Sequence, residues 1–185
     1  MKKLGDVLKG VASVLLLAGL VTVSVATMLG GCQKEKEVDL PFETIERADL
    51  AGTGEYYEGE EPKLFVITEA AEIDALGNTI SFDAQAQLRN LDFDRYFAVA
   101  VFQGGQPDLP PPPSGIEVQG ISKQGITITT YIHIYEPAEE VELRAVVASP
   151  YHLVKIRKGE DMQGEFQFIL DVDGATVSQQ THRLP

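Results

Sequence analysis

The stretch Tyr96-Phe97-Ala98-Val99-Ala100-Val101-Phe102 contains no polar side chain except the phenol at its start, and it decides the fold. A strand with one face in water alternates apolar and polar residues, whereas a continuously apolar strand is typically buried on both faces. We therefore expect residues 96–102 to form the central strand of a sheet that is covered on both sides.

Further strands are predicted before and after this run. Residues 42–45 and 63–67 combine aromatic or β-branched residues in short segments, which is typical of strands. On the C-terminal side, residues 116–121 and 126–135 alternate on either side of a turn at 123–125 and predict a hairpin. The remaining predicted strands are residues 143–148, 151–156, and 165–170, the last pairing with residues from 176 onward across Asp173-Gly174.

A first short helix is expected after Thr68. This residue is the predicted N-cap, and Glu69 and Glu72 would lie near the positive end of the helix dipole. Ile73 and Leu76, three residues apart, are the predicted buried pair.

A second short helix is predicted over residues 81–88, with Phe82, Ala86 and Leu88 on its inner side. Strands on both sides of a short helical insertion are typical of an α+β domain. We therefore predict a mostly antiparallel, sandwich-like β-sheet domain with one or two short helices inserted after the early strands.

The first 32 residues have the three parts of an export signal. Lys2, Lys3 and Lys9 make the start basic, residues 11–28 are mainly apolar, and Leu29-Gly30-Gly31 directly precedes Cys32. This order resembles the lipobox of bacterial lipoprotein precursors. The resemblance implies that residues 1–31 are a cleaved signal peptide, that Cys32 carries covalent lipid, and that the protein lies on the extracytoplasmic side of a bacterial membrane.

An uncleaved transmembrane helix is the alternative anchor, because roughly 20 mostly apolar residues can cross a bilayer. Cys32 favours the lipid, since it is the only cysteine of the chain and occupies the lipobox position. A diacylglycerol thioether with a further acyl chain would exceed the single chain that binds membranes only marginally. Residues 32–40, rich in charge, then predict a flexible tether to a single domain at 41–185.

The charge of the chain limits its partners. Residues 1–31 contain three lysines and one aspartate, so the remainder has 12 basic and 27 acidic residues and a formal net charge of −15. Binding to nucleic acid requires a positive surface, and this composition argues against it. With Cys32 used for lipid, no disulfide can form within the chain.

A long glycine- and proline-rich loop follows the central strand. The loop begins at Gln103, Gly104 and Gly105 and continues through Pro107 to Pro110-Pro111-Pro112-Pro113. Four consecutive prolines adopt the extended polyproline II conformation, which aromatic-lined grooves of partner proteins can bind. The loop is thus a candidate interaction element, and a rigid connection without a binding role is the alternative.

Four segments in the same order resemble the accessory domains of protease complexes, the PrcB type. They are residues 42–47, 66–68, 92–104 and 148–154, and the resemblance spans about residues 42–170. The last segment contains the most distinctive part, Ser149-Pro150-Tyr151-His152. The glycine-tyrosine loop of the family is replaced here by the proline run. The resemblance implies a lipoprotein that binds or matures a secreted protease and has no catalysis of its own.

Two other functions are weighed against this one. Ser149 and His152 could form a nucleophile and base in a small hydrolase, but residues three apart in a strand point to opposite faces, and no Gly-x-Ser-x-Gly motif is present. We therefore predict no enzyme activity and expect Tyr151 and Leu153 on one face, with His152 and Val154 on the other.

The second alternative is a surface lipoprotein that binds a cation or a small ligand. The histidines at 133, 152 and 182 lack the short spacing of a metal site, and 171–174 resembles only the start of a calcium loop. A hairpin turn explains Asp173-Gly174 more simply, and the acidic residues at 58–61 predict a solvated loop. We expect neither a metal nor a bound cofactor. The leading hypothesis is a membrane-anchored binding module for a protein partner.

Overall fold

The apolar run forms strand β4 (Tyr96–Phe102), which lies between β3 (Lys63–Ile67) and β7 (Tyr151–Arg157) and is antiparallel to both. Its side chains alternate between two buried environments. Phe97, Val99 and Val101 face a second sheet, whereas Ala98, Ala100 and Phe102 pack against the helices. The prediction of a central strand buried on both faces is confirmed.

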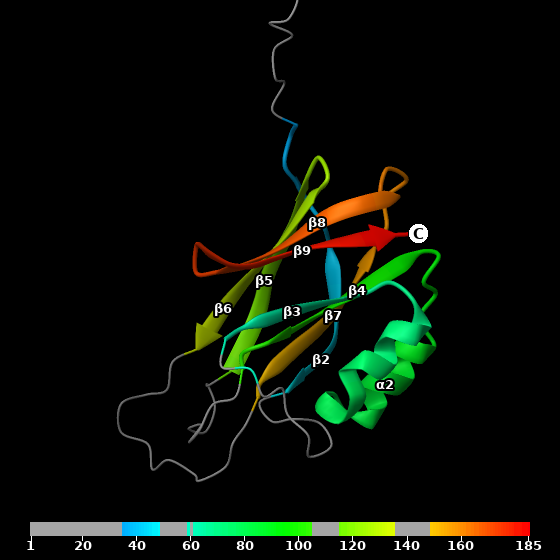
Figure 1. The fold of residues 1–185 in the computed structure, drawn as a ribbon, viewed down its shortest axis with the longest axis vertical. Helices are drawn as coiled ribbons and strands as arrows, with labels where there is room; N and C mark the ends of the chain where they lie inside the picture. The colour runs from blue at the N-terminus through cyan, green and yellow to red at the C-terminus, as the bar shows by residue number, and fades with distance from the viewer. Residues whose placement is uncertain (1–34, 49–58, 60, 105–114, 136–148) are drawn as a thin grey trace, which may run out of the picture. The chain divides into compact units, whose positions relative to one another are not determined.

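The computed structural model describes residues 35–48, 59, 61–104, 115–135 and 149–185 (Figure 1). Several sequence predictions lie outside these ranges: the signal segment with Cys32, residues 58 and 60 of the acidic loop, Gly105 with the proline run, and the strand at 143–148. The chain divides into Met1–Lys34 and Glu35–Pro185, and only the second unit is described below.

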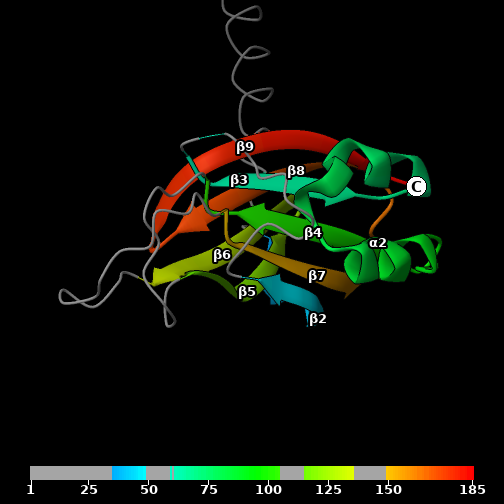
Figure 2. The ribbon, with the colours of Figure 1, turned by 90° about the horizontal axis from the view of Figure 1, so that it is seen from below.

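Two sheets pack face to face in the described part of the chain. One has the order β2-β7-β4-β3, which Figure 2 shows from bottom to top, and the other has the order β1-β5-β6-β8-β9. Their inward side chains share one apolar core, so the predicted sandwich-like α+β fold is confirmed. The remaining strands are β1 (Val38–Asp39), β2 (Phe42–Ala48), β5 (Gly115–Gln124), β6 (Thr127–Tyr135), β8 (Gly164–Val172) and β9 (Ala175–Leu184).

Strand pairing follows the sequence prediction at the two hairpins. β5 and β6 are antiparallel and connect through Gly125, whose φ of +60° is accessible to glycine. β8 and β9 are antiparallel around Asp173-Gly174, both with positive φ, as in the mirror-image turns that hairpins favour. The two hairpins join through β6 and β8, which are parallel, and this is the one parallel pair among the described strands.

The first helix, η1 (Ala70–Thr79), has 3₁₀ geometry and begins one residue later than predicted. Its N-cap is Glu69, and the prediction of Thr68 was wrong. The carboxylate of Glu72 accepts hydrogen bonds from the N–H groups of Thr68 (2.6 Å) and Glu69 (3.3 Å), which moves the start of the helix past Thr68. Ile73 and Leu76 are buried, as predicted.

The second helix, α2 (Phe82–Arg89), has its N-cap at Ser81, whose Oγ accepts from the N–H of Ala84. Leu88 is buried as predicted, but the predictions for Phe82 and Ala86 were wrong: Phe82 is 70% exposed, and Ala86 is exposed as well. The buried neighbours of Leu88 are Ala84 and Gln85. Ala84 precedes Leu88 by four residues and shares its face, whereas Phe82 precedes it by six and lies off that face.

The predicted flexible tether at 32–40 ends in ordered structure. Val38 and Asp39 form β1 and pair with Lys123 and Ser122 of β5. Leu40 continues the contact through its N–H, which donates to the carbonyl of Ile121 at 2.8 Å, and its side chain packs on the core. The tether prediction is therefore wrong for its last three residues. Because β1 and β2 belong to different sheets, residues 40 and 41 carry the chain from one layer to the other.

Candidate functional site

Three long segments outside the described ranges leave and rejoin the sandwich at the same end. Ala48, where β2 ends, pairs with Tyr151, where β7 begins, and Tyr151 pairs with Phe102, where β4 ends. In the other sheet, Gly115 and Tyr135 pair at the start of β5 and the end of β6. We call this the loop-bearing end.

Two contacts join the sheets at the loop-bearing end. Arg47 of β2 forms an ion pair with Glu117 of β5 at 3.2 Å, and the N–H of Val118 donates to the imidazole of His152 on β7. The strand ends of both sheets therefore lie together there.

The described start of the proline-rich loop belongs to this end. Gln103 extends the ladder beyond β4, because its N–H donates to the carbonyl of Pro150 at 2.9 Å. Gln103 is 7% exposed, and its Oε1 has no hydrogen-bond partner among the described residues. Gly104 follows with a φ of +99°, a value that L side chains rarely adopt, so the chain turns out of the ladder here.

Ser149 is also a buried polar residue. It is fully buried, and its Oγ makes no hydrogen bond to any residue that the structure describes. A buried hydroxyl left unpaired costs on the order of 1–3 kcal/mol. Ser149 and Gln103 lie next to each other in the structure, since Pro150 connects them through its carbonyl. The loop-bearing end therefore holds two unsatisfied polar groups.

Tyr151 points to the opposite side of β7 and stabilises the helical layer. Its hydroxyl donates to Glu46 Oε2 at 2.6 Å and accepts from the N–H of Ser81 at 3.0 Å. Burial and the carboxylate of Glu46 raise the pKa of this phenol. Ser81 Oγ donates to the same carboxylate oxygen, so the start of α2 is tied to β2 and β7. The role of Tyr151 in these contacts is structural.

His152 lies between the two sheets, and both of its ring nitrogens are occupied. Nδ1 accepts from the N–H of Val118 at 2.9 Å, which leaves the proton on Nε2 to donate to Thr44 Oγ1 at 2.9 Å. Burial, with a contribution from Arg47, lowers the pKa of His152 to about 4. The ring is therefore neutral near pH 7, and its tautomer is determined by its two partners.

Ser149 and His152 do not form a nucleophile–base pair in this structure. The Oγ of Ser149 has no hydrogen-bond partner, and the imidazole makes its two hydrogen bonds elsewhere. The predicted alternation along β7 is confirmed: Tyr151 and Leu153 pack in the helix-side core, whereas Val154 packs between the sheets, on the side where His152 contacts β5.

A partly exposed charged cluster, which sequence reasoning missed, adjoins His152. The carboxylate of Glu117 accepts from the hydroxyl of Tyr135 and pairs with Arg47, whose guanidinium lies 5.3 Å from the ring centre of Tyr135. The hydrogen bond from Tyr135, followed by the charge of Arg47, lowers the pKa of Glu117. His133 contacts the edge of the Tyr135 ring.

Part of this cluster follows from the predicted hairpin, because Glu117 and His133 are cross-strand partners in its register. Arg47 lies in the other sheet, and no local sequence pattern places it there. The cluster can form hydrogen bonds and ion pairs with a ligand, because Arg47 and Glu117 each expose about a third of their side chains, 35% and 33%.

The three histidines lie in separate environments. His133 contacts Asp173 at 2.6 Å, His152 contacts Thr44 and Val118, and His182 contacts Glu72 at 2.8 Å. Within the described ranges, no three His, Cys, Asp or Glu side chains are grouped as a metal site would require. Asp171-Val172-Asp173-Gly174 forms the predicted hairpin turn, in which the N–H of Gly174 donates to Asp171 Oδ1.

The site residues thus fall into three groups. Four of them lie near the loop-bearing end: Gln103, Gly104, Ser149 and His152. Tyr151 instead forms the hydrogen bonds that stabilise the helical layer. Gly105, the prolines at 107 and 110–113, and Leu29, Gly30, Gly31 and Cys32 lie outside the described residues. In the described ranges, no helix is long and apolar enough to span a membrane. Comparisons with protein-family models, with curated proteins and with solved structures found no match to this chain.

Proposed function

We propose that this chain is a membrane-anchored extracytoplasmic lipoprotein whose loop-bearing end binds a protein partner. The observation that carries the proposal is the position of the loop-bearing end relative to Glu35, where the described chain begins. Glu35 lies beside the β5–β6 turn, because its carbonyl accepts from the side chain of Gln124. The loop-bearing end is at the other end of the same hairpin, beyond Gly115 and Tyr135.

The separation of these two ends suits a display function. β5 has ten residues, and at 3.3–3.4 Å per residue it is about 30 Å long. A lipid on Cys32 would hold the Glu35 end at the membrane, and the hairpin would carry the loop-bearing end away from it. The anchor would also raise the effective concentration of the domain near partners at the same surface.

The polar groups at the loop-bearing end fit a protein ligand. Gln103 Oε1 and Ser149 Oγ are buried and have no partner within the described ranges, and a bound backbone N–H could satisfy either of them. Arg47 and Glu117 offer both signs of charge at the rim. The proline-rich run that follows Gly104 adds a stiff segment suited to an aromatic-lined groove.

The class of partner is inferred from the segments that resemble PrcB-type accessory domains, which imply a secreted protease. The described part of that resemblance includes β4 and the Ser149–Tyr151 region, both of which adjoin the loop-bearing end. We accordingly propose assembly or stabilisation of a secreted protease as the role of the binding.

Site-specific photocrosslinking in the native envelope tests the proposal. A benzoylphenylalanine replaces Tyr135 at the loop-bearing end, and the matched control carries it at Phe82, an exposed aromatic residue on α2. We expect a product of discrete mass from position 135 that decreases when residues 110–113 are deleted, and none from position 82. Equal products at both positions, or none at position 135, would contradict a partner at this end.

The anchor has its own test. Changing Cys32 to Ser should abolish lipid attachment and release the processed domain from the membrane. Unchanged membrane retention of that variant would contradict the lipoprotein assignment and favour the uncleaved helix.

A further inference from the structure

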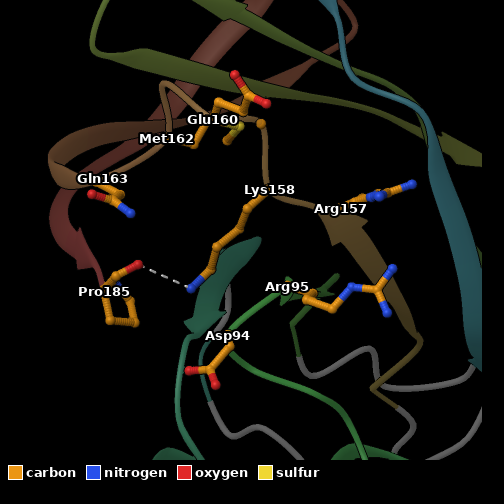
Figure 3. Close-up of a pocket in the computed structure, with 9 residues that line it drawn as sticks. Asp94, Arg95, Arg157, Lys158, Glu160, Met162, Gln163 and Pro185 are labelled. Carbon is orange, nitrogen blue, oxygen red and sulfur yellow. Dashed lines mark hydrogen bonds between the residues drawn. The ribbon is translucent and has the colours of Figure 1, made fainter.

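A surface groove runs beside the segment where the described chain begins. It is lined by the apolar residues Val38, Leu40, Pro41 and Met162 and has a volume of about 370 Å³. Its polar lining has both signs of charge, with Lys123, Arg157 and Lys158 beside Asp39 and Asp161. A second hollow adjoins it through Arg157, Lys158, Gly159 and Met162, and Arg95, Asp94 and Glu160 also line that hollow (Figure 3). We call the two together the Met162 groove. Its basic and acidic lining residues are equal in number, so which cations are already paired decides whether it can bind an anion.

The cations of the Met162 groove differ in their partners. Lys123 is paired with Asp161 at 2.5 Å, and Lys158 turns inward, where its Nζ donates to the carbonyl of Phe93 at 2.8 Å. By contrast, Arg95 and Arg157 are exposed and form no salt bridge within the described ranges. Figure 3 shows their guanidinium groups extending to the same side. They are therefore available to an anion.

An aromatic residue, Tyr96, lies beside two basic side chains of this surface. Tyr96 is the cross-strand partner of Arg157, and its ring lies 5.8 Å from the guanidinium of Arg95 and 5.7 Å from the ammonium of Lys155. Tyrosine and arginine together are typical of surfaces at the level of lipid headgroups, where the ring is amphipathic and the cation meets phosphate.

The covalent chain connects this groove to the proposed anchor. Val38 follows Glu35 by three residues, and Cys32 precedes Glu35 by three. Three extended residues span at most about 11 Å, so a lipid on Cys32 would keep Glu35 that close to its point of attachment. The Met162 groove lies beside β1, so such a lipid would hold it close to the headgroups, and Val38 in the groove is 53% exposed.

We propose that the Met162 groove is a second membrane contact, which binds the headgroup of an anionic phospholipid through Arg95 and Arg157 and lays Val38 and Pro41 against the interface. The inference rests on the proposed lipid anchor. Because the rest of the domain is acidic, an anionic membrane repels it, and this contact would keep the loop-bearing end directed outward. The lipid anchor would thus limit the distance of the domain from the membrane, and the groove would determine the orientation of the domain.

Fluorescence of the lipidated full chain in vesicles tests the contact. The protein contains no tryptophan, so a tryptophan introduced at Val38 is a unique reporter, with Val177 on β9 as the matched exposed control. In vesicles that contain phosphatidylglycerol and brominated acyl chains, we expect strong quenching at position 38 and little at position 177. A tryptophan at Gln163, which lines the same groove, is a second reporter outside β1.

The arginines give the decisive comparison. A juxtamembrane basic residue contributes about 1 kcal/mol on an anionic leaflet, so Arg95→Gln or Arg157→Gln should each reduce the docked population about fivefold. Arg89→Gln, an exposed arginine on α2, should leave quenching unchanged. Added inorganic phosphate should not displace the protein if the ligand is a headgroup in the membrane, and displacement by phosphate would overturn the lipid assignment.

Failure of this inference differs from failure of the anchor. If the wild-type chain does not remain with the vesicles at all, the lipid anchor is refuted. If it remains but quenching is equal at positions 38 and 177, or is insensitive to Arg95 and Arg157, the groove does not contact the membrane.

Discussion

The backbone N–H of Val118 on β5 donates a 2.9 Å hydrogen bond to Nδ1 of His152 on β7. The two residues belong to different sheets, so a side chain of one layer satisfies a backbone donor of the other. Strand β1 covers β5 only at Ser122 and Lys123, which leaves Val118 without a strand partner on that edge. The imidazole of His152 accepts from this N–H in place of a strand. Only the neutral imidazole can do so, because Nδ1 must be unprotonated to accept.

The stability of the domain should therefore fall with acidification over a defined interval. Because the pKa of His152 is about 4 in the folded chain and 6.5 in the unfolded chain, the unfolded state binds the proton first. The contribution is complete above pH 6.5, is lost as the pH falls towards 4, and amounts to at most about 3 kcal/mol. Urea unfolding across this interval measures it.

One variant isolates the contribution of His152. His152→Gln should be less stable than the wild type near pH 7, and its stability should depend less steeply on pH between 6.5 and 4. Equal slopes for the wild type and His152→Gln would rule out the buried imidazole as the source.

Tyr151→Phe should loosen the attachment of α2. The variant removes a hydroxyl that donates to Glu46 and accepts from the N–H of Ser81, and each buried group left unpaired costs on the order of 1–3 kcal/mol. We expect a loss of that size in the free energy of unfolding. Tyr96→Phe serves as the control, because Tyr96 is half-buried and its hydroxyl has no such contacts within the described part of the chain. A comparable loss there would contradict the assignment.

The face of α2 can be tested by truncation. Leu88 is fully buried, so Leu88→Ala should cost about 2–5 kcal/mol through lost apolar contact and the resulting cavity. Phe82 is 70% exposed, and Phe82→Ala should change stability by no more than about 0.5 kcal/mol. Thermal or urea unfolding of the two variants measures these losses. A larger loss of stability for Phe82→Ala than for Leu88→Ala would mean that Phe82 lies on the buried face of α2, as the sequence predicts.

The turn between β8 and β9 should be sensitive to backbone conformation alone. Gly174 has a φ of +90°, and a Cβ placed there would meet no atom within 4 Å, so Gly174→Ala should cost about 1–2 kcal/mol without any steric clash. Gly120, without a positive φ, is the control. Its Cβ would lie 3.7 Å from Tyr131, an ordinary contact, and Gly120→Ala should be neutral or slightly stabilising.

The sequence predicted the elements whose signals are local. The apolar run of β4, the alternation of β5 and β6, and Asp173-Gly174 each specify a strand or turn from neighbouring residues alone, and the structure agrees with them. The parallel pairing of β6 with β8 is different, because their residues are about 40 positions apart and no local pattern indicates which strands become neighbours.

The errors arose where two local signals competed. Val38 and Leu40 lie in a segment whose charge predicts a tether, yet residues 38 and 39 pair with the edge of β5. In α2 the buried face contains the small Ala84, which packs in the same core as Leu88, and Phe82 lies off that face. Among the site residues, Gln103 and Ser149 could be identified from the sequence, whereas Arg47 required the packing of two sheets.

The transfer of the chain between layers at residues 40 and 41 has a mechanical consequence. Any pull on the N-terminal side reaches the two residues of β1 before it reaches the seven of β2. The weaker pairing yields first, so β1 separates from β5 before β2 separates from β7. The domain therefore meets tension first at a two-residue strand, and the sheet that contains β2 bears the load only afterwards.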